Sequence, residues 1–194
     1  MAIQSYTFPY GRGTKTFDYE ADDVLKVVRT EDLPVIENVR EAVLDAIRHP
    51  IGTKPLEEII RPGDTVAFIC NDPTRVANSE IFMPILVEEM NRLGVPDENM
   101  RIVFALGTHR AMTPEEMSAE GGADVARRIK HYNSISTIDE DFVYFGTTSR
   151  GTPVRINKHL CDVDHVILTG TIVHHYFSGS NISKPSKGIT SRLF

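Results

Sequence analysis

The sequence predicts an α/β fold in which an open, mostly parallel sheet carries helices on both faces and follows an N-terminal β-hairpin. From Arg61 onward, apolar strand-like runs alternate with helical periodicity in the order strand, loop, helix, strand, loop, helix. This order is typical of parallel strands joined by right-handed crossovers. Before that region, aromatic residues stand on both sides of a glycine turn, which is typical of paired antiparallel strands.

The amino-terminal part supplies the hairpin and one helix. Residues Ser5 to Tyr19 carry aromatic side chains around Tyr10-Gly-Arg-Gly13, which predicts two short strands and a tight turn. After Pro34 the apolar positions recur at helical spacing, and His49-Pro-Ile-Gly52 ends the pattern. We expect this helix to cover one face of the sheet. Its apolar positions are Val35, Ile36, Val39, Val43, Leu44 and Ile47.

The central region contains two strand-loop-helix units. Thr65 to Cys70 is a β-branched and aromatic strand that leads into the polar loop Asn71 to Arg75, and a helix then runs to Gly94. Arg101 to Leu106 is the next strand. After it, Thr113-Pro-Glu-Glu116 is a capping-box pattern with proline at the first helical position, which predicts a helix start. The repetition makes the predicted sheet Rossmann-like.

The last part of the chain adds strands and then changes character. Asp141 to Gly146 and Pro153 to Asn157 predict two strands around a polar turn, and Val163 to Leu168 predicts one more buried strand. After Gly179 neither helical nor strand periodicity persists. We therefore expect an α/β domain over residues 1–179 and an atypical tail over residues 180–194.

Composition limits the classes of partner. With 194 residues, a net charge of −6 and a pI of about 5.6, the chain has no basic character that would favour nucleic acid or an anionic membrane. Cys70 and Cys161 are the only cysteines, which favours a reduced, cytoplasmic setting. We also expect no export signal and no membrane anchor, because no apolar stretch approaches about 18 residues.

Three polar clusters follow the predicted parallel strands. They are Asn71 to Arg75, Gly107 to Arg110, and the pair His174 and His175. Ligands bind beyond the carboxyl ends of the strands in open parallel sheets, so we expect the three clusters to meet at one edge.

The first two clusters contain candidate substrate and proton-transfer groups. Arg75 is suited to a substrate carboxylate, because a planar guanidinium donates two parallel hydrogen bonds. Alternatively, Asp72 caps a turn and Arg75 pairs with a surface carboxylate. In the second cluster, Gly107 lets the backbone approach a ligand, and His109 is a candidate base or only a backbone hydrogen-bonding residue.

The third cluster places two histidines in succession. Side chains of His174 and His175 point to opposite faces if the strand continues through them, so at most one faces the site. Histidines from different strands, with an arginine nearby, favour acid/base chemistry on a small carboxylate and inversion at a carbon centre. The sequence has no His-Glu-x-x-His helix, Walker loop or Gly-x-Ser-x-Gly elbow, so a self-contained zinc site and those catalytic motifs are not expected.

Four segments together match a known pattern. They are Asn71-Asp-Pro-Thr-Arg75, Ala105-Leu-Gly-Thr-His-Arg-Ala-Met-Thr113, Gly146-Thr-Thr-Ser-Arg-Gly-Thr-Pro-Val154 and His174-His-Tyr-Phe-Ser-Gly179. In this order they resemble the N-terminal domain of the nickel-dependent lactate racemase family. The resemblance implies an α/β domain that pairs with a second domain, with the active site between them and a nickel-pincer nucleotide as cofactor. In that family the cofactor accepts hydride from the α-carbon of lactate while a histidine takes the hydroxyl proton.

The resemblance also implies roles for individual residues. His109 and His175 correspond to the two catalytic histidines, with His174 as a second candidate for the latter role. Arg75 resembles the substrate-orienting arginine, and Asp72 resembles an acidic residue of the same loop, so both are candidates for substrate binding. On the cofactor side the candidates are Gly107, Thr108 and Lys184.

The chain departs from the family pattern after Gly179. Ser180-Asn-Ile-Ser183 replaces a glycine-rich run, and Lys184 stands one position before the family's cofactor-tethering lysine, with Lys187 following. No histidine after His175 matches the family's nickel ligand. The metal-binding residues therefore stay unassigned. The departure implies that residues 180–194 are a truncated or frame-shifted tail and that the family's second domain is missing.

The leading hypothesis is the N-terminal domain of a racemase or epimerase of 2-hydroxy acids, incomplete in this form. Its expected partners are a small 2-hydroxy acid and the missing C-terminal domain. Two alternatives remain open: a non-catalytic module that binds a nucleotide or a partner domain, and a metal-assisted hydrolase with His109, His175 and Asp72 as ligands.

Overall fold

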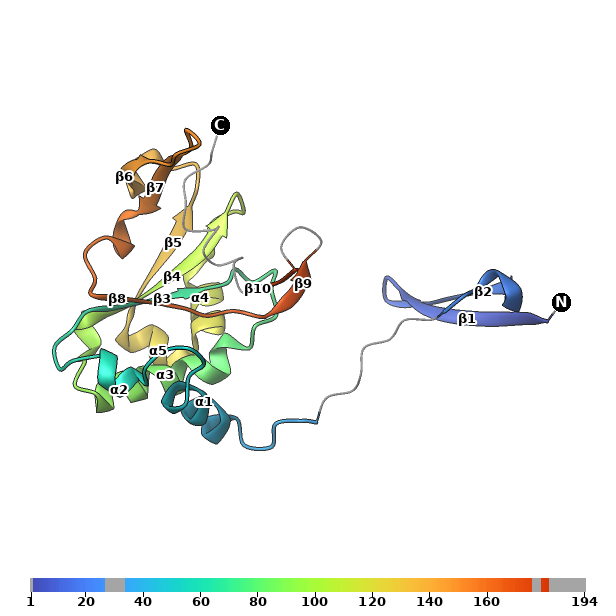
Figure 1. Ribbon diagram of the computed structural model, residues 1–194, viewed down its shortest axis with the longest axis horizontal. Helices are drawn as coiled ribbons and strands as arrows, with labels where there is room; N and C mark the ends of the chain where they lie inside the picture. The colour runs from blue at the N-terminus through green and yellow to red at the C-terminus, as the bar shows by residue number, and fades with distance from the viewer. Residues whose placement is uncertain (1, 27–33, 176–178, 182–194) are drawn as a thin grey trace. The chain divides into compact units, whose positions relative to one another are not determined.

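The computed structural model describes residues 2–26, 34–175 and 179–181 (Figure 1). The chain divides into two compact units, Met1–Ile36 and Glu37–Phe194, which are described separately. Among the described residues no helix is long and apolar enough to cross a membrane.

The first unit is the predicted β-hairpin. Strand β1 (Ile3–Tyr10) pairs antiparallel with β2 (Gly13–Glu20), and the 3-10 helix η1 (Ala21–Asp23) follows. Gly11 has φ +58°, a left-handed conformation that glycine adopts without strain and that allows the tight turn. On one face the ring of Phe17 contacts the rings of its aromatic neighbours, which are Tyr6, Phe8 and Tyr19.

The second unit is organised around a four-stranded parallel sheet in the order β5-β4-β3-β8. Its strands are β3 (Val66–Cys70), β4 (Met100–Gly107), β5 (Lys130–Ile135) and β8 (His165–Leu168). The central strand β3 is fully buried, which fits its unbroken run of apolar residues. The α/β class and the parallel sheet are confirmed, while β5 is a strand that the sequence pattern did not reveal.

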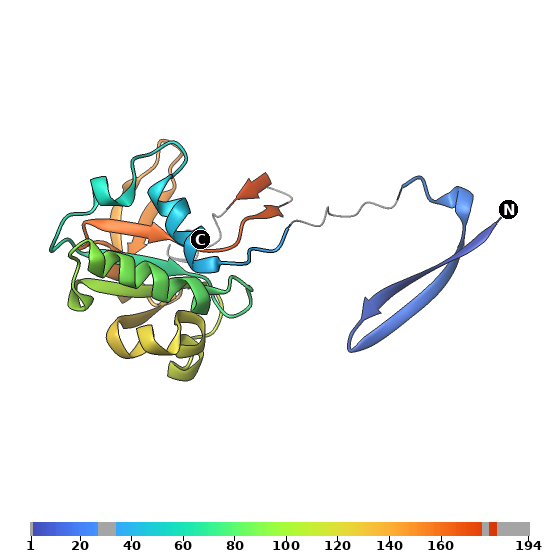
Figure 2. The same ribbon diagram turned by 90° about the horizontal axis from the view of Figure 1, so that it is seen from below.

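The α-helices lie against one face of this sheet, where their apolar residues join Val66 and Phe68 in the larger core cluster (Figure 2). Helix α1 begins at Val39 because Asn38 caps it by accepting from the Glu41 N–H, so it starts later than the apolar pattern after Pro34 suggested. The helices are α1 (Val39–Arg48), α2 (Leu56–Ile59), α3 (Ser79–Arg92), α4 (Pro114–Gly121) and α5 (Ala123–Arg128).

The opposite face of the sheet has a different cover. Ala67 and Ile69 of β3 pack there against Ile156 of strand β7 (Pro153–Asn157) and Leu160 of the 3-10 helix η4 (Lys158–Leu160). Among the described residues, the α-helices therefore cover one face of the sheet, and a strand with a 3-10 helix covers part of the other. The remaining elements are η2 (Asp97–Asn99), η3 (Asp139–Asp141), β6 (Phe142–Thr147), β9 (Val173–His175) and β10 (Gly179–Asn181).

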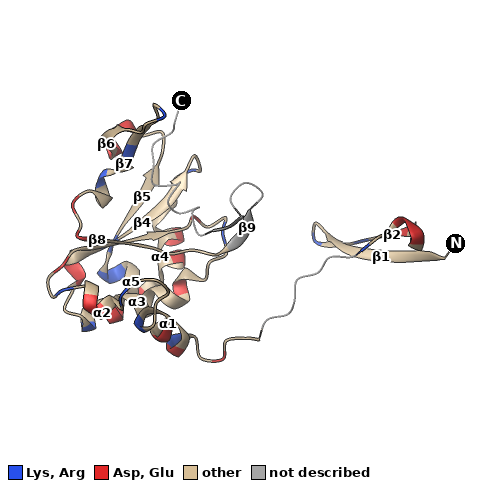
Figure 3. Ribbon diagram, in the orientation of Figure 1, with Lys and Arg blue, Asp and Glu red and all other residues tan. Residues whose placement is uncertain are grey.

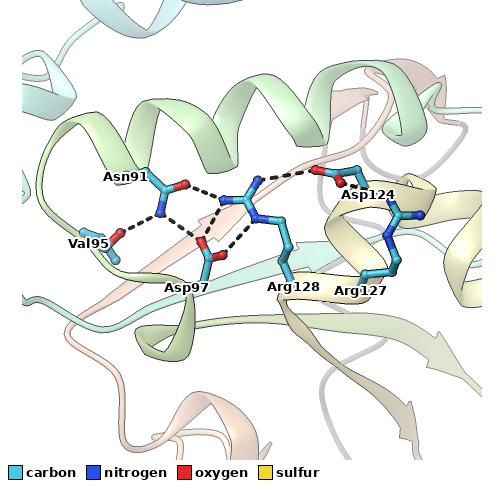
Figure 4. A network of polar contacts seen from close by, with 6 residues as sticks. All are labelled: Asn91, Val95, Asp97, Asp124, Arg127 and Arg128. Atoms are coloured by element: carbon cyan, nitrogen blue, oxygen red, sulfur yellow. Dashed lines mark hydrogen bonds and ion pairs between the residues drawn. The ribbon is translucent and has the colours of Figure 1, made fainter.

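Charged residues of both signs are mixed along the helices of the second unit (Figure 3). The most connected group lies near the amino ends of β4 and β5, where the Arg128 guanidinium binds both oxygens of Asp97 at 2.8 Å and Asn91 Oδ1 at 2.7 Å (Figure 4). Asn91 in turn donates to Asp97 and to the Val95 carbonyl. This network joins α3, η2 and α5 near the amino ends of these two strands.

Candidate functional site

The three predicted clusters follow strands that are neighbours in the sheet. The loop Asn71 to Arg75 leaves β3, the turn Gly107 to Arg110 ends β4, and the segment after β8 leads to β9 (Figure 1). Because β3 lies between β4 and β8, its loop lies between the other two. The segment after β8 is tied to it directly, since Thr171 Oγ1 donates to the Val76 carbonyl at 2.8 Å.

The first two clusters meet through one side-chain contact. His109 Nδ1 lies 2.9 Å from Asp72 Oδ2. The Asp72 side chain is only 8% exposed, whereas that of His109 is 45% exposed. The contact therefore joins a buried carboxylate to an imidazole that is partly exposed to solvent.

The second oxygen of Asp72 shapes the loop. Asp72 Oδ1 accepts from the Thr74 N–H at 2.8 Å and also from the Thr74 hydroxyl, and the Arg75 N–H donates to the Asp72 carbonyl at 3.1 Å. The turn role that we considered for Asp72 is therefore present together with its contact to His109. Thr74 was not singled out from the sequence, although an aspartate two positions before a threonine is a common turn signal.

Local geometry fixes where His109 stands. Gly107 has φ +60°, and the register between β4 and β5 shifts at this point. The His109 N–H then donates to the Leu106 carbonyl at 3.0 Å, which closes a tight turn. Glycine is required there because few residues with a side chain adopt that backbone conformation.

The two arginines of the site loops differ in their contacts. Arg110 donates to both oxygens of Glu116, at 2.7 and 2.5 Å, and this ion pair lowers the pKa of Glu116 to about 2. Arg75 is exposed, and no hydrogen bond or ion pair engages its guanidinium within the described ranges. Of the two, only Arg75 is free to bind an anion.

The third cluster is described only in its backbone. His174 and His175 lie in β9, which pairs antiparallel with β10, with His175 opposite Gly179. Their side chains, and all of Lys184, lie outside the described part of the chain. Whether His175 faces His109 therefore stays a prediction.

Two titratable groups near the site, Glu120 and Cys70, were not candidate site residues in the sequence analysis. Burial raises the pKa of Glu120, and the charges of Glu80 and Asp72 raise it further. Burial also raises the pKa of the Cys70 thiol to about 12, so this cysteine is not a nucleophile near neutral pH. Within the described residues, no three His, Cys, Asp or Glu side chains are placed to hold a metal ion.

Comparison with known proteins identifies the domain. The family profile described as the lactate racemase N-terminal domain matches residues 10–183. Lactate racemase from Thermoanaerobacterium thermosaccharolyticum is 30% identical over 88% of this chain and 40% of its own length. Lactate racemase from Lactiplantibacillus plantarum is 34% identical over 72% of this chain and 33% of its own length. The chain thus spans less than half the length of these relatives.

Solved structures agree with the sequence comparison. The lactate racemase apoprotein from T. thermosaccharolyticum superposes with a TM-score of 0.82 at 28% identity, over 97% of this chain and 44% of that one. A Thermotoga maritima protein shares the fold, with a TM-score of 0.63 at 24% identity, over 79% of this chain and 39% of that one. The chain therefore belongs to the lactate racemase family, of which it carries the N-terminal domain.

Proposed function

We propose that this domain contributes the proton-transfer and carboxylate-binding residues of a racemase or epimerase that acts on 2-hydroxy acids resembling lactate, and that it is inactive alone. The observation that carries the proposal is the contact between the Asp72 and His109 loops, which brings a histidine and the unpaired Arg75 to one edge of the sheet. A substrate with a carboxylate and a hydroxyl on adjacent carbons would place its carboxylate at Arg75 and its hydroxyl at His109.

The chain's own residues suggest the following division of work. Arg75 binds the substrate carboxylate through two charge-assisted hydrogen bonds and so fixes the position of the α-carbon. His109 accepts the hydroxyl proton at Nε2, the ring nitrogen not in contact with Asp72, and later returns it. His175 is the second base in this proposal, acting on the other enantiomer from the opposite side.

The cofactor belongs to the same proposal. The described donor atoms do not by themselves form a metal site. We infer from the family that the complete protein uses a nickel-pincer nucleotide, which accepts and returns hydride, near Gly107 and Thr108, with Lys184 as the candidate tether. We also propose a cytoplasmic setting, which is supported by the two free cysteines, Cys70 and Cys161.

The part of the relatives that extends beyond this domain is the expected protein partner. Strand β8 is an outer strand of the described sheet, and its apolar residues Val166 and Leu168 are 41% and 40% exposed. Val166 and Leu168 pair with Ala67 and Ile69, which belong to the buried core. The apolar face of the sheet therefore extends from the core onto the partly exposed strand β8. This uncovered surface is consistent with packing against a further part of the polypeptide.

The test uses a full-length protein that contains this domain, loaded with activated cofactor, and measures interconversion of D- and L-lactate by chiral chromatography. His175→Ala should abolish interconversion, while His174→Ala should lower it less. His49→Ala, at an exposed position directly after α1, is the matched control and should leave the rate unchanged. Failure of the wild-type protein to interconvert lactate or another 2-hydroxy acid would contradict the proposed reaction.

A further inference from the structure

Asp72 has almost no capacity left for a ligand. One oxygen contacts His109 Nδ1 at 2.9 Å, and the other accepts both the N–H and the hydroxyl of Thr74. The carboxylate is also nearly buried. A substrate carboxylate placed next to it would meet a like charge, which is unfavourable.

The contact with Asp72 bears on which ring nitrogen of a neutral His109 carries the proton. An ionised carboxylate presents only lone pairs, and a lone pair on Nδ1 at 2.9 Å from it would be repelled, so this contact favours the neutral form of His109 with its proton on Nδ1. The other nitrogen, Nε2, then has a free lone pair, and no group among the described residues bonds to it. Nε2 is the atom that can take a proton from a substrate.

We propose that Asp72 is a positioning residue, which fixes His109 as the Nδ1–H tautomer and orients Nε2 toward the substrate, and that it does not bind the substrate itself. Thr74 supports this role by holding the second carboxylate oxygen and so preventing rotation of the group. The catalytic consequence rests on the proposed racemase function. The tautomer itself does not, and can be measured on the 194-residue chain without cofactor.

Asp72→Asn is the most informative variant because Thr74 determines which way the new side-chain amide points. Both Thr74 groups at this point are donors, so they retain the amide oxygen and direct the amide nitrogen toward His109. That nitrogen donates to Nδ1, and the imidazole proton moves to Nε2. The variant preserves shape and reverses the tautomer.

The described part of the chain offers two further histidine–aspartate pairs, which serve as controls. His49 Nδ1 lies 2.8 Å from Asp45 on the exposed surface of α1, where water competes with the pair. His165 contacts Asp64 through Nε2, also at 2.8 Å, which favours the opposite tautomer. Asp45→Asn should therefore leave the His109 signals unchanged.

The experiment records long-range proton–nitrogen spectra of the 194-residue chain with ¹⁵N-labelled histidine at about pH 8, where histidine is ordinarily neutral. We expect His109 as Nδ1–H in the wild type, Nε2–H in Asp72→Asn, and a mixture in Thr74→Val. Unchanged His165 signals show that each variant is folded. A wild-type Nε2–H tautomer, or no change in Asp72→Asn, overturns the proposal.

Kinetics on the full-length enzyme separate positioning from substrate binding. In Asp72→Asn we expect kcat to fall by about 100-fold or more, the usual contribution of a general base, with KM nearly unchanged. A rise in KM at constant kcat would instead make Asp72 a substrate ligand. If the wild-type enzyme shows no racemisation, the proposed function fails while the tautomer result still stands.

Discussion

The two ends of the parallel sheet each hold a histidine against an aspartate, but the surroundings of the two pairs differ. At the amino end, Asp64 Oδ2 accepts from the Arg61 N–H and contacts His165 Nε2, both at 2.8 Å. The His165 side chain is 25% exposed, against 45% for His109 at the carboxyl end. The same chemical pair is thus less accessible to a ligand at the amino end than at the carboxyl end.

Neighbouring groups strengthen the contrast. At the amino end, the Asp164 carboxylate accepts from both the N–H and the hydroxyl of Thr65, and the Arg128 network engages Asp97 and Asn91. At the carboxyl end, the Arg75 guanidinium has no hydrogen-bond or ion-pair partner among the described residues. Saturated polar groups stabilise a fold, whereas unsaturated ones are available to a ligand.

The largest expected effect tests this contrast with matched histidine substitutions in the full-length enzyme. His109→Ala should lower kcat for lactate racemisation by about 10² to 10⁴-fold, because a general base is lost. His165→Ala should leave kcat unchanged and shift only the unfolding midpoint in urea. Comparable losses of activity in both variants would contradict the assignment of the two ends.

The next effect compares the free arginine with the paired one. Arg75→Ala should raise KM for lactate by about 10- to 100-fold, since a hydrogen-bonded charge contact contributes about 1.5–3 kcal/mol. Arg110→Ala removes a pair with Glu116 on an exposed surface and should change KM little. Steady-state kinetics with both enantiomers provide the measurement, and an equal rise in the two variants would argue against a specific role for Arg75.

A smaller effect on stability is expected at the amino end. Arg128→Ala should lower the free energy of unfolding by about 1–2 kcal/mol, because Asp97 and Asn91 lose their shared partner and the site is partly exposed. Urea unfolding followed by circular dichroism measures the change. Arg127→Ala, which removes one exposed contact with Asp124, is the control and should have almost no effect.

The smallest effect concerns pH. Hydrogen bonds from the Arg61 N–H and from His165 hold the pKa of Asp64 below the ordinary 3.8, and those from Thr65 do the same for Asp164. A lowered folded pKa gives stability that is present above the unfolded pKa and lost as pH falls through the folded one. Urea midpoints should therefore decline below about pH 4, and a double Asp64→Asn, Asp164→Asn variant should show a flatter decline.

Local patterns predicted most of the elements. The capping box at Thr113 is present as expected, with its hydroxyl accepting from the Glu116 N–H and the Glu116 carboxylate from the Thr113 N–H. The hairpin around Gly11 and the strands β3 and β4 also follow from their composition. Strand β5 was missed because Lys130–Ile135 has no clear alternation, and its extended form comes from pairing along β4.

The sequence by itself determined which polar loops follow the parallel strands, because glycine, proline and apolar periodicity act over a few residues. It named His109, Arg75 and Asp72 without deciding what each one contacts. Only the tertiary structure joined Asp72 to His109, paired Arg110 with Glu116 and left Arg75 unpaired within the described chain. These outcomes depend on which loops neighbouring strands bring together, and strand order is set by packing of the whole sheet.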